Sequence, residues 1–459
     1  MHALCGALRS HATQWTQFDR DAQEAQRGAP ADALRALIGV VRNAVYESET
    51  NQLALLEHWD ALVPLLEYCL PFERMNDPTL MPLVRVLAQL LANCMGGCAH
   101  MRANLWRRHF ISLDTTSAPL EAVRPLLASA DGRTVVAAQV CILHAVQASD
   151  TIDYAAELAH LSGGRDILEV LLSGYDAATG DDGPEAGAVL DIAVHIVRRL
   201  FERGHTSVLL DGSMGPMQIT LLRVLADVLQ ERVEECATQH VAPLPRAAVA
   251  PLARLLGTLA HDAADIMHAH LASEETDLRE LIRAHIALVA LLDSLTSVAM
   301  AGHELESDAP RLAELRDDVM LEATVRLLNA SHAFFPAQSP FQGTSVGEAP
   351  AGHVLSATGR AAQLQHQHQQ HSQRPALHTL KRGAIRLLGK PYTPAVAAVQ
   401  DRVREAGGLL DVLNATVLDE TNPYMREHAI FTLRALLDRN EASQAQIAEL
   451  RPIEPNTTG

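Results

Sequence analysis

The sequence is poor in aromatic residues and in lysine. Phe, Trp and Tyr make up 4% of the 459 residues, and Lys381 and Lys390 are the two lysines. Strands favour aromatic and β-branched residues, whereas Ala and Leu favour helices. Apolar residues nevertheless account for 48% of the chain. The core therefore has to be built mainly from Ala, Leu, Val and Ile, which favours helices over sheets.

Positive charge is also scarce. The chain has 37 Lys and Arg against 55 Asp and Glu, and its formal net charge is −18. Proteins that bind nucleic acid neutralise its phosphates with clustered Lys and Arg. We therefore expect no nucleic-acid partner.

Cysteine and long apolar runs are lacking as well. Six cysteines in a chain of this length are too sparse for a disulfide scaffold. We find no apolar run of the roughly 20 residues that a membrane span needs. Residues 1–6 show no basic region followed by an apolar stretch, the pattern of a secretory signal. These features predict a reduced, cytoplasmic protein without membrane insertion.

What is present is a helical period along most of the chain. Leu83, Leu87, Leu90 and Leu91 place apolar groups on one helical face, and similar spacing returns in residues 252–259 and 282–295. Gly and Pro clusters separate the segments, and no stretch alternates with a period of two. The fold class that follows is all-α.

A second pattern concerns how these helices pack. Residues 87–90, 225–228 and 256–259 each read Leu, small, polar, apolar, and the small residue lets a neighbouring helix approach closely. Pairs or triplets of short helices over about 40–47 residues are typical of armadillo and HEAT arrays. We predict such an α-solenoid, and the period alone leaves an ordinary helical bundle open.

One segment interrupts the array. Residues 337–375 are rich in Pro, Gly, Ser, Gln and His, a composition that cannot bury enough apolar surface to offset the entropy of ordering. We predict a disordered linker there. It separates an N-terminal armadillo-like array, residues 1–336, from a C-terminal domain, residues 376–451, which is followed by a flexible tail, residues 452–459.

The candidate metal ligands are His366, His368 and His371, inside this linker. Imidazoles bind copper and zinc, but a low-complexity tract gives the same residues, and we favour that interpretation. Cys94 and Cys98 have no second pair at zinc-ligand spacing and fit core packing. We predict no metal site and no cofactor.

No catalytic motif is present either. Residues 383–390 resemble a phosphate loop, but the glycines are one residue too far apart and Pro391 stands where Ser or Thr would bind magnesium. Residues 212–215 lack the spacing of a nucleophile elbow. We therefore predict that the protein is not an enzyme.

The C-terminal part contains the most readable helix. Asn422 is a candidate N-cap and Pro423 suits the first helical position. We predict an apolar core stripe, with Phe431 also in the core, and a left-handed stop at Asn440. A second helix, residues 443–450, should turn Ile447 and Leu450 inward. The stripe consists of Ile430, Leu433 and Leu437, widened by Ala429 and Leu436.

This region resembles the C-terminal domain of the ataxin-10 family. The resemblance rests on residues 422–431, which read NPYMREHAIF, on the following Leu433, Arg434, Leu436, Leu437 and Asn440, and on residues 381–389 and 400–408 upstream. Residues 87–93, ending at Asn93, look like the family's early armadillo-type repeat. One departure is Ala435, where the family usually has an asparagine.

The resemblance implies a non-catalytic armadillo-like scaffold that binds other proteins and is associated with cytokinesis and cell division. Candidate partner-binding residues are Asn93, Arg426, Glu427 and Arg434, and self-association stays open. Some fungal relatives carry a copper-transport name, so a copper-handling protein using the histidine tract is one alternative. A solenoid resembling a nuclear-transport receptor is another, although we find no regular asparagine or tryptophan ladder.

Overall fold

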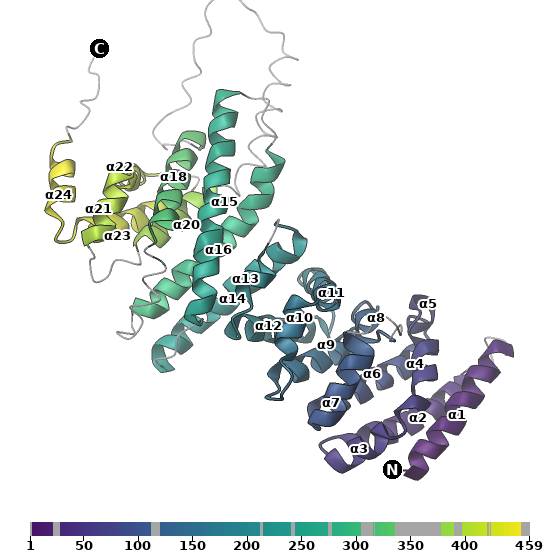
Figure 1. The fold of residues 1–459 in the computed structure, drawn as a ribbon. Helices are drawn as coiled ribbons and strands as arrows, with labels where there is room; N and C mark the ends of the chain where they lie inside the picture. The colour runs from purple at the N-terminus through teal and green to yellow at the C-terminus, as the bar shows by residue number, and fades with distance from the viewer. Residues whose placement is uncertain are drawn as a thin grey trace, which may run out of the picture. The chain divides into compact units, whose positions relative to one another are not determined.

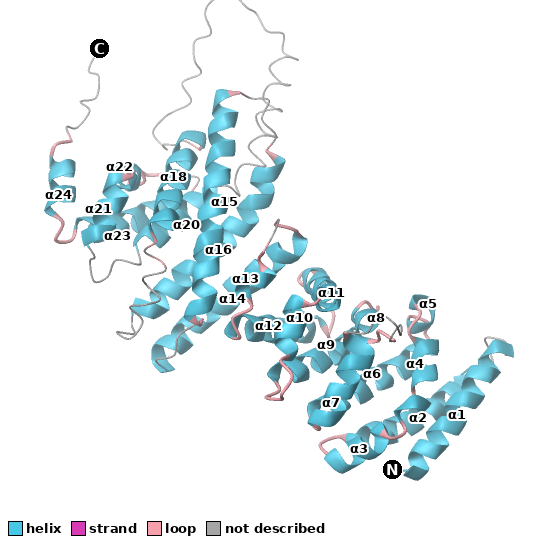
Figure 2. Ribbon diagram, viewed as in Figure 1, coloured by secondary structure: helices cyan, strands magenta, loops and turns pink. Residues whose placement is uncertain are grey.

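The computed structural model describes residues 2–21, 28–111, 120–211, 214–239, 244–273, 278–303, 315, 317–335, 378–389, 397–419, 422 and 424–450. Every regular element in these ranges is helical (Figure 2). The predicted all-α fold is confirmed. The predicted linker, residues 337–375, and the predicted tail, residues 452–459, lie outside the described residues.

The helices form two compact units, residues 1–224 and 225–459, with the boundary inside α14, Pro216–Gln239 (Figure 1). The sequence analysis instead predicted that the chain divides into two parts at residues 337–375. The first unit contains α1 His2–Asp21, α2 Gly28–Val45, α3 Glu49–Leu56, η2 Trp59–Ala61, α4 Val63–Cys69, α5 Phe72–Met75, α6 Met81–Gly96, α7 Ala99–Leu105, the π-helical turn η3 Trp106–Phe110, α8 Val123–Leu127, α9 Gly132–Gln147, α10 Tyr154–His160, α11 Ser162–Ala178, α12 Ala186–Glu202 and α13 Thr206–Leu209.

Four long helices repeat through the first unit. Helix α2 packs on α6, α6 on α9, and α9 on α12, with shorter helices between them. Their starts lie roughly 50 residues apart, slightly more than the about 40–47 residues of armadillo and HEAT repeats. The predicted solenoid is confirmed in its stacking.

Two tryptophans, Trp59 and Trp106, lie where successive repeats join. Trp59 and Trp106 are fully buried. The indole of Trp59 donates to His109 Nε2 at 2.7 Å, and that of Trp106 donates to Glu157 at 2.8 Å. Burial lowers the pKa of His109, so its ring stays neutral and accepts the bond. Both tryptophans therefore bury a large ring while keeping their N–H paired.

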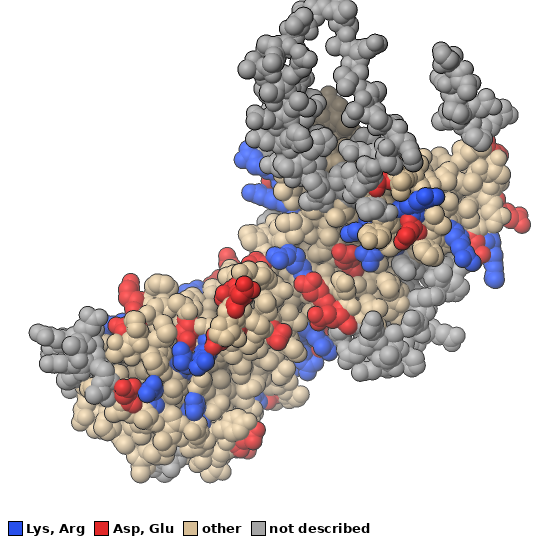
Figure 3. Space-filling model, turned by 180° about the vertical axis from the view of Figure 1, so that it is seen from behind, with Lys and Arg blue, Asp and Glu red and all other residues tan. Residues whose placement is uncertain are grey.

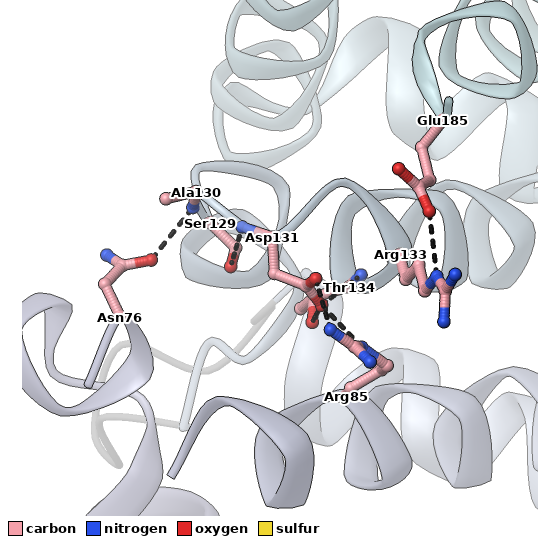
Figure 4. A network of polar contacts seen from close by, with 8 residues as sticks. All are labelled: Asn76, Arg85, Ser129, Ala130, Asp131, Arg133, Thr134 and Glu185. Carbon is pink, nitrogen blue, oxygen red and sulfur yellow. Dashed lines mark hydrogen bonds and ion pairs between the residues drawn. The ribbon is translucent and has the colours of Figure 1, made fainter. Parts of the chain in front are cut away.

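Polar contacts also join successive repeats (Figure 4). Asp131 caps α9 by accepting from the Thr134 amide, and it pairs with Arg85 of α6 at 2.7 Å. Burial alone would raise the pKa of Asp131, but the bonds from Arg85 and Thr134 outweigh it and hold that pKa low. Arg133 of α9 then pairs with Glu185, just before α12, at 2.8 Å. A chain of ion pairs thus runs across three repeats.

The second unit continues across the predicted linker. Helix α18, which precedes the linker, contacts α20, α21 and α22 after it, and α16 contacts α20. The two parts flanking residues 336–377 therefore form one packed unit. Its helices are α15 Arg246–Ala272, α16 Arg279–His303, α18 Asp318–Phe334, α20 His378–Gly389, α21 Ala397–Glu405, α22 Gly408–Asn414, α23 Met425–Leu437 and α24 Glu441–Ala448.

One described helix has the length and apolar composition needed to cross a membrane. It is the segment Arg279–Ala301 of α16, and 67% of its apolar window is buried against the rest of the protein. The expectation that no segment reaches spanning length is corrected here. The helix packs against α15 and α20, as a core helix does.

Charged side chains of both signs are interspersed on the face shown in Figure 3. Red and blue groups lie side by side at several places there, and uncharged areas lie between these clusters. The excess of acidic residues in the chain is therefore not gathered into one patch among the described residues of that face.

Candidate protein-binding surfaces

Helix α23 packs against α20 and α22 through a narrow stripe. Its buried residues are Met425, Ala429, Thr432 and Leu436, which recur every three or four positions. The Thr432 hydroxyl donates to the Ile385 carbonyl of α20 at 2.9 Å. This stripe, and not the most apolar one, fixes the rotation of the helix.

Small residues allow the close approach of α20 and α23. A Cβ on Gly389, at the end of α20, would lie against the Thr432 side chain. Ala429 is fully buried beside it on the same face of α23. A glycine against Thr432 lets the two helix backbones come close together, which a leucine at that position would prevent.

The predicted core position of Phe431 is wrong. Its side chain is 70% exposed, and Ile430 is 48% exposed. Leu433 and Leu437 are half-buried at the edges of the interface. The helix carries two competing stripes, and the close fit to α20 selects the one centred on Ala429 and Thr432.

The opposite side of α23 is exposed and combines apolar with charged side chains. Residues 427, 430, 431 and 434 follow the i, i+3, i+4, i+7 spacing of one helical face. Tyr424 extends that face by one turn and is 62% exposed. We call this set the outer face of α23; it consists of Tyr424, Glu427, Ile430, Phe431 and Arg434.

The three predicted partner-binding charges of this helix are exposed. Glu427 and Arg434 lie on the outer face, whereas Arg426 points to a different side of α23. Among the described residues, none of the three forms an ion pair or a side-chain hydrogen bond. Their charges are thus available to a partner.

The ends of α23 differ from the sequence prediction. Pro423 lies outside the described residues, and the N-cap is Tyr424, without a side-chain cap. Asn422 is buried and is not the N-cap residue. The left-handed residue after the helix is Arg439, with φ of 54°, and not Asn440.

Asn440 instead begins the next helix. Its side chain accepts from the Ser443 amide at 2.8 Å and caps α24. Its amide also donates to Gln400 at 3.2 Å and to Asp401 at 3.1 Å. Hydrogen bonds from Asn440 and Arg404 lower the pKa of Asp401. Asn440 therefore ties α21 to the junction of α23 and α24.

Helix α24 is less buried than predicted. It spans Glu441–Ala448, two residues earlier than expected. Ile447 is half-buried, and Leu450, predicted to face inward, is 44% exposed beyond the end of the helix. The prediction for Leu450 is wrong because the helix ends before it.

The sequence that forms α20–α24 matches a known domain. A family model described as the spinocerebellar ataxia type 10 protein domain matches residues 380–458. An ataxin-10 homolog of Candida albicans is 41% identical over 51 residues, which is 11% of this chain and 11% of the relative. The C-terminal domain belongs to the ataxin-10 family. The curated match thus spans about a tenth of that relative's length.

The chain also shows a weak similarity to a solved structure. The crystal structure of an engineered protein aligns with 94% of this chain and 98% of its own, at 11% identity and a TM-score of 0.30. A score this low carries no argument about fold or function.

The ataxin-10 domain is tied to α18 through a buried lysine. Lys381 of α20 is fully buried, and its ammonium donates to the Phe335 carbonyl. Burial lowers the pKa of Lys381, while the nearby carboxylate of Asp419 raises it in part. Sequence analysis missed this residue, although a lysine within the apolar stretch 380–388 was a visible signal.

A carboxyl group lies buried in the same region. Burial raises the pKa of Asp411, on α22, while a hydrogen bond from the Asn329 amide of α18, at 3.4 Å, acts in the opposite direction. Contacts of α18 with both α20 and α22 therefore include buried polar groups, which specify how the ataxin-10 domain is seated.

In the first unit, Asn93 borders a surface hollow of about 440 Å³ between α2 and α6. The Asn93 amide donates to the Arg42 carbonyl at 3.0 Å. The side chain of Arg42 reaches Asn43 and Gln89, and Tyr46 completes the lining. Sequence analysis found Asn93 alone, because the other four are joined to it by folding and share no motif.

The candidate metal ligands give no site in the described part of the chain. His366, His368 and His371 lie outside the described residues. Among those described, no group of three or more His, Cys, Asp and Glu could hold a metal ion. Cys94 and Cys98 are buried, and burial raises the pKa of the Cys94 thiol. Both cysteines pack in the core, as predicted.

Proposed function

We propose that the protein is a cytoplasmic protein-binding scaffold of ataxin-10 type that acts in cytokinesis. Membership of its C-terminal domain in that family supports a non-catalytic protein. The observation that carries the binding role is the exposure of Phe431, at 70%, on the outer face of α23. A helix that leaves a phenylalanine and an isoleucine in water is a candidate contact surface.

The face also suggests what it would bind. Glu427 and Arg434 lie two turns apart, with Ile430 and Phe431 between them. The matching partner is an amphipathic helix of another protein, with apolar anchors between a basic and an acidic residue. Such a pairing fixes the direction of the bound helix, because the charges match in one orientation only.

A rescue experiment tests this proposal. A cell culture depleted of the protein should accumulate multinucleate cells, and expression of the wild-type chain should restore normal division. A chain with Ile430→Ser and Phe431→Ser should fold normally yet fail to restore it. The charge swap Glu427→Arg with Arg434→Glu should fail too, because it reverses the pattern without changing net charge.

The matched control is Arg254→Glu, an exposed charge change on α15 of the same unit. It should rescue as well as the wild-type chain. Full rescue by both outer-face variants would show that this surface has no role in division. Normal division after depletion would refute the cytokinesis role itself.

A further inference from the structure

Arg42, in the hollow between α2 and α6, forms no ion pair with a described carboxylate. Its Nε and Nη2 donate to Asn43 Oδ1 at 3.0 and 2.8 Å, and Nη1 donates to Gln89 Oε1. Both acceptors are neutral amide oxygens. Guanidinium has five N–H donors, so the described residues leave two of them without an acceptor.

This environment differs from that of other arginines in the same unit. Arg85, Arg102 and Arg107 each reach a carboxylate of the next repeat within 3 Å. Their charges are compensated within the fold. Arg42 is set among amides, in a chain with a net charge of −18, so it offers a local site for an anionic group that the molecule as a whole would repel.

The hollow also has an acceptor suited to a peptide backbone. Asn93 uses its amide to hold the Arg42 carbonyl, which leaves its Oδ1 without a partner among the described residues. The backbone of Asn93 is held in place by the side chain of Gln52, which is fully buried. Gln52 donates to the Asn93 and Val45 carbonyls, both at 3.0 Å, and accepts from the Cys98 amide at 2.7 Å.

Tyr46 supplies an apolar wall to the same hollow. It is 59% exposed, and its hydroxyl is hydrogen-bonded to Glu47, which raises the pKa of the tyrosine. Glu47 directly follows Tyr46 in the sequence. Its negative charge repels an acidic ligand that Arg42 attracts.

We propose that this hollow binds an extended, acidic peptide segment of a partner protein. A Glu or Asp side chain of the segment pairs with the free N–H groups of Arg42, and a backbone N–H donates to Asn93 Oδ1. Charge-assisted hydrogen bonds of this kind are about twice as strong as neutral ones. The site lies in the first unit, apart from the outer face of α23, so its failure would leave the proposed function standing.

The test uses the full-length chain and an array of ten-residue peptides, each made in a Glu form and a Gln form. Affinities of the strongest pairs are then measured by fluorescence anisotropy at low salt. We expect the Glu form to bind about tenfold more tightly than the Gln form. Arg42→Gln should abolish this preference without changing the thermal melting of the chain.

Two further variants make the test specific. Arg35→Gln alters an exposed arginine of the same helix that pairs with Asp32 at 3.1 Å, and it should leave binding unchanged. Glu47→Gln should tighten binding of the Glu form by about two- to threefold, because it removes a repulsive charge. A gain of affinity cannot result from misfolding.

The opposite outcomes overturn the proposal. Equal affinity for Glu and Gln forms, or equal losses in the Arg42 and Arg35 variants, would show that Arg42 recognises no carboxylate. Displacement of the peptide by free glutamate at the same concentration would show a simple anion site. In that case the peptide backbone and Asn93 contribute nothing.

Discussion

The ammonium group of Lys381 donates a hydrogen bond to the backbone carbonyl of Phe335. Phe335 is the last described residue before residues 336–377, and Lys381 lies near the start of α20 just after them. Arg386 also pairs with Asp293 of α16 at 3.0 Å. The two ends of the predicted linker are thereby held by the same packed unit.

The first prediction follows from this closure. A specific protease site inserted near residue 350 should be cut without separating the two parts, because α18 packs on α20, α21 and α22. The sequence predicted a disordered linker at residues 337–375, and the packing of α18 on the helices after it predicts that the two fragments stay associated. Denaturing gels should show two fragments, and native gel filtration a single peak.

Urea provides the control for the nicking experiment. Above the unfolding transition the fragments should separate, and after its removal they should elute together again. Separate elution of the two fragments in native buffer, at micromolar concentration, would contradict the packing of α18 on the ataxin-10 domain.

The second prediction concerns the buried charge of Lys381. Lys381→Ala should lower the free energy of unfolding by about 2–4 kcal/mol, because it opens a cavity and removes the buried hydrogen bond to the Phe335 carbonyl. Lys381→Met fills the same space and removes the desolvated charge, so it should cost less, about 1 kcal/mol. Urea titration measures both.

Arg382 provides the neighbouring control, since it is half-buried on the same helix. Arg382→Ala should change stability by less than about 1 kcal/mol. If Lys381→Ala were as mild as Arg382→Ala, the buried hydrogen bond would contribute nothing to the seating of the domain.

The third prediction is a pH dependence from His332 of α18. Burial and the charge of Lys381 lower its pKa to about 4. A hydrogen bond to the Asp411 backbone and the charge of Asp419 raise the pKa, but they only partly offset this effect. Between pH 6.5 and 4 the unfolded chain binds a proton that the native state refuses. The free energy of unfolding should therefore decrease as the pH is lowered from 6.5 to 4, by at most about 3 kcal/mol.

Comparison of two variants isolates this contribution. His332→Gln removes the titrating group, so its stability should fall less between pH 7 and 5 than that of the wild-type chain. His100→Gln, at an exposed position on α7, should follow the wild-type curve. Identical curves for both variants would assign the pH dependence to other groups.

Local patterns predicted the helices well but not their contacts. The 3.6-residue period located α6, α16 and α23 because each needs one apolar face regardless of its neighbour. The period does not say which of two faces is buried when both carry apolar residues. In α23 that choice depends on Gly389 of α20, which lies 43 positions before Thr432 in sequence.

Caps and binding residues show the same limit. Asn440 was recognised as a helix boundary, but its role in the following helix depends on Gln400 and on the left-handed Arg439. The hollow around Asn93 depends on Arg42, one repeat earlier. Such contacts join residues about 40–50 positions apart, and a single sequence contains no local signal for them.

The final prediction separates the two faces of α23. Leu436 is buried against the domain, so Leu436→Ala should lower the free energy of unfolding by about 2–4 kcal/mol. Phe431→Ala should cost less than about 1 kcal/mol, well below the 3–5 kcal/mol expected if its ring were buried. Urea titrations of the full chain, followed by circular dichroism, give both values.

A third variant checks the assignment of the faces. Phe431→Ser makes the exposed position polar, and it should leave stability close to that of Phe431→Ala while weakening partner binding. A cost of 3 kcal/mol or more for either Phe431 variant would place the ring in the core and remove the outer face as a docking surface. A large effect of Leu436→Ala with a small effect of both Phe431 variants assigns packing to one side of α23. It leaves the other side, with its exposed aromatic ring between two charges that have no ion-pair partner among the described residues, free for recognition.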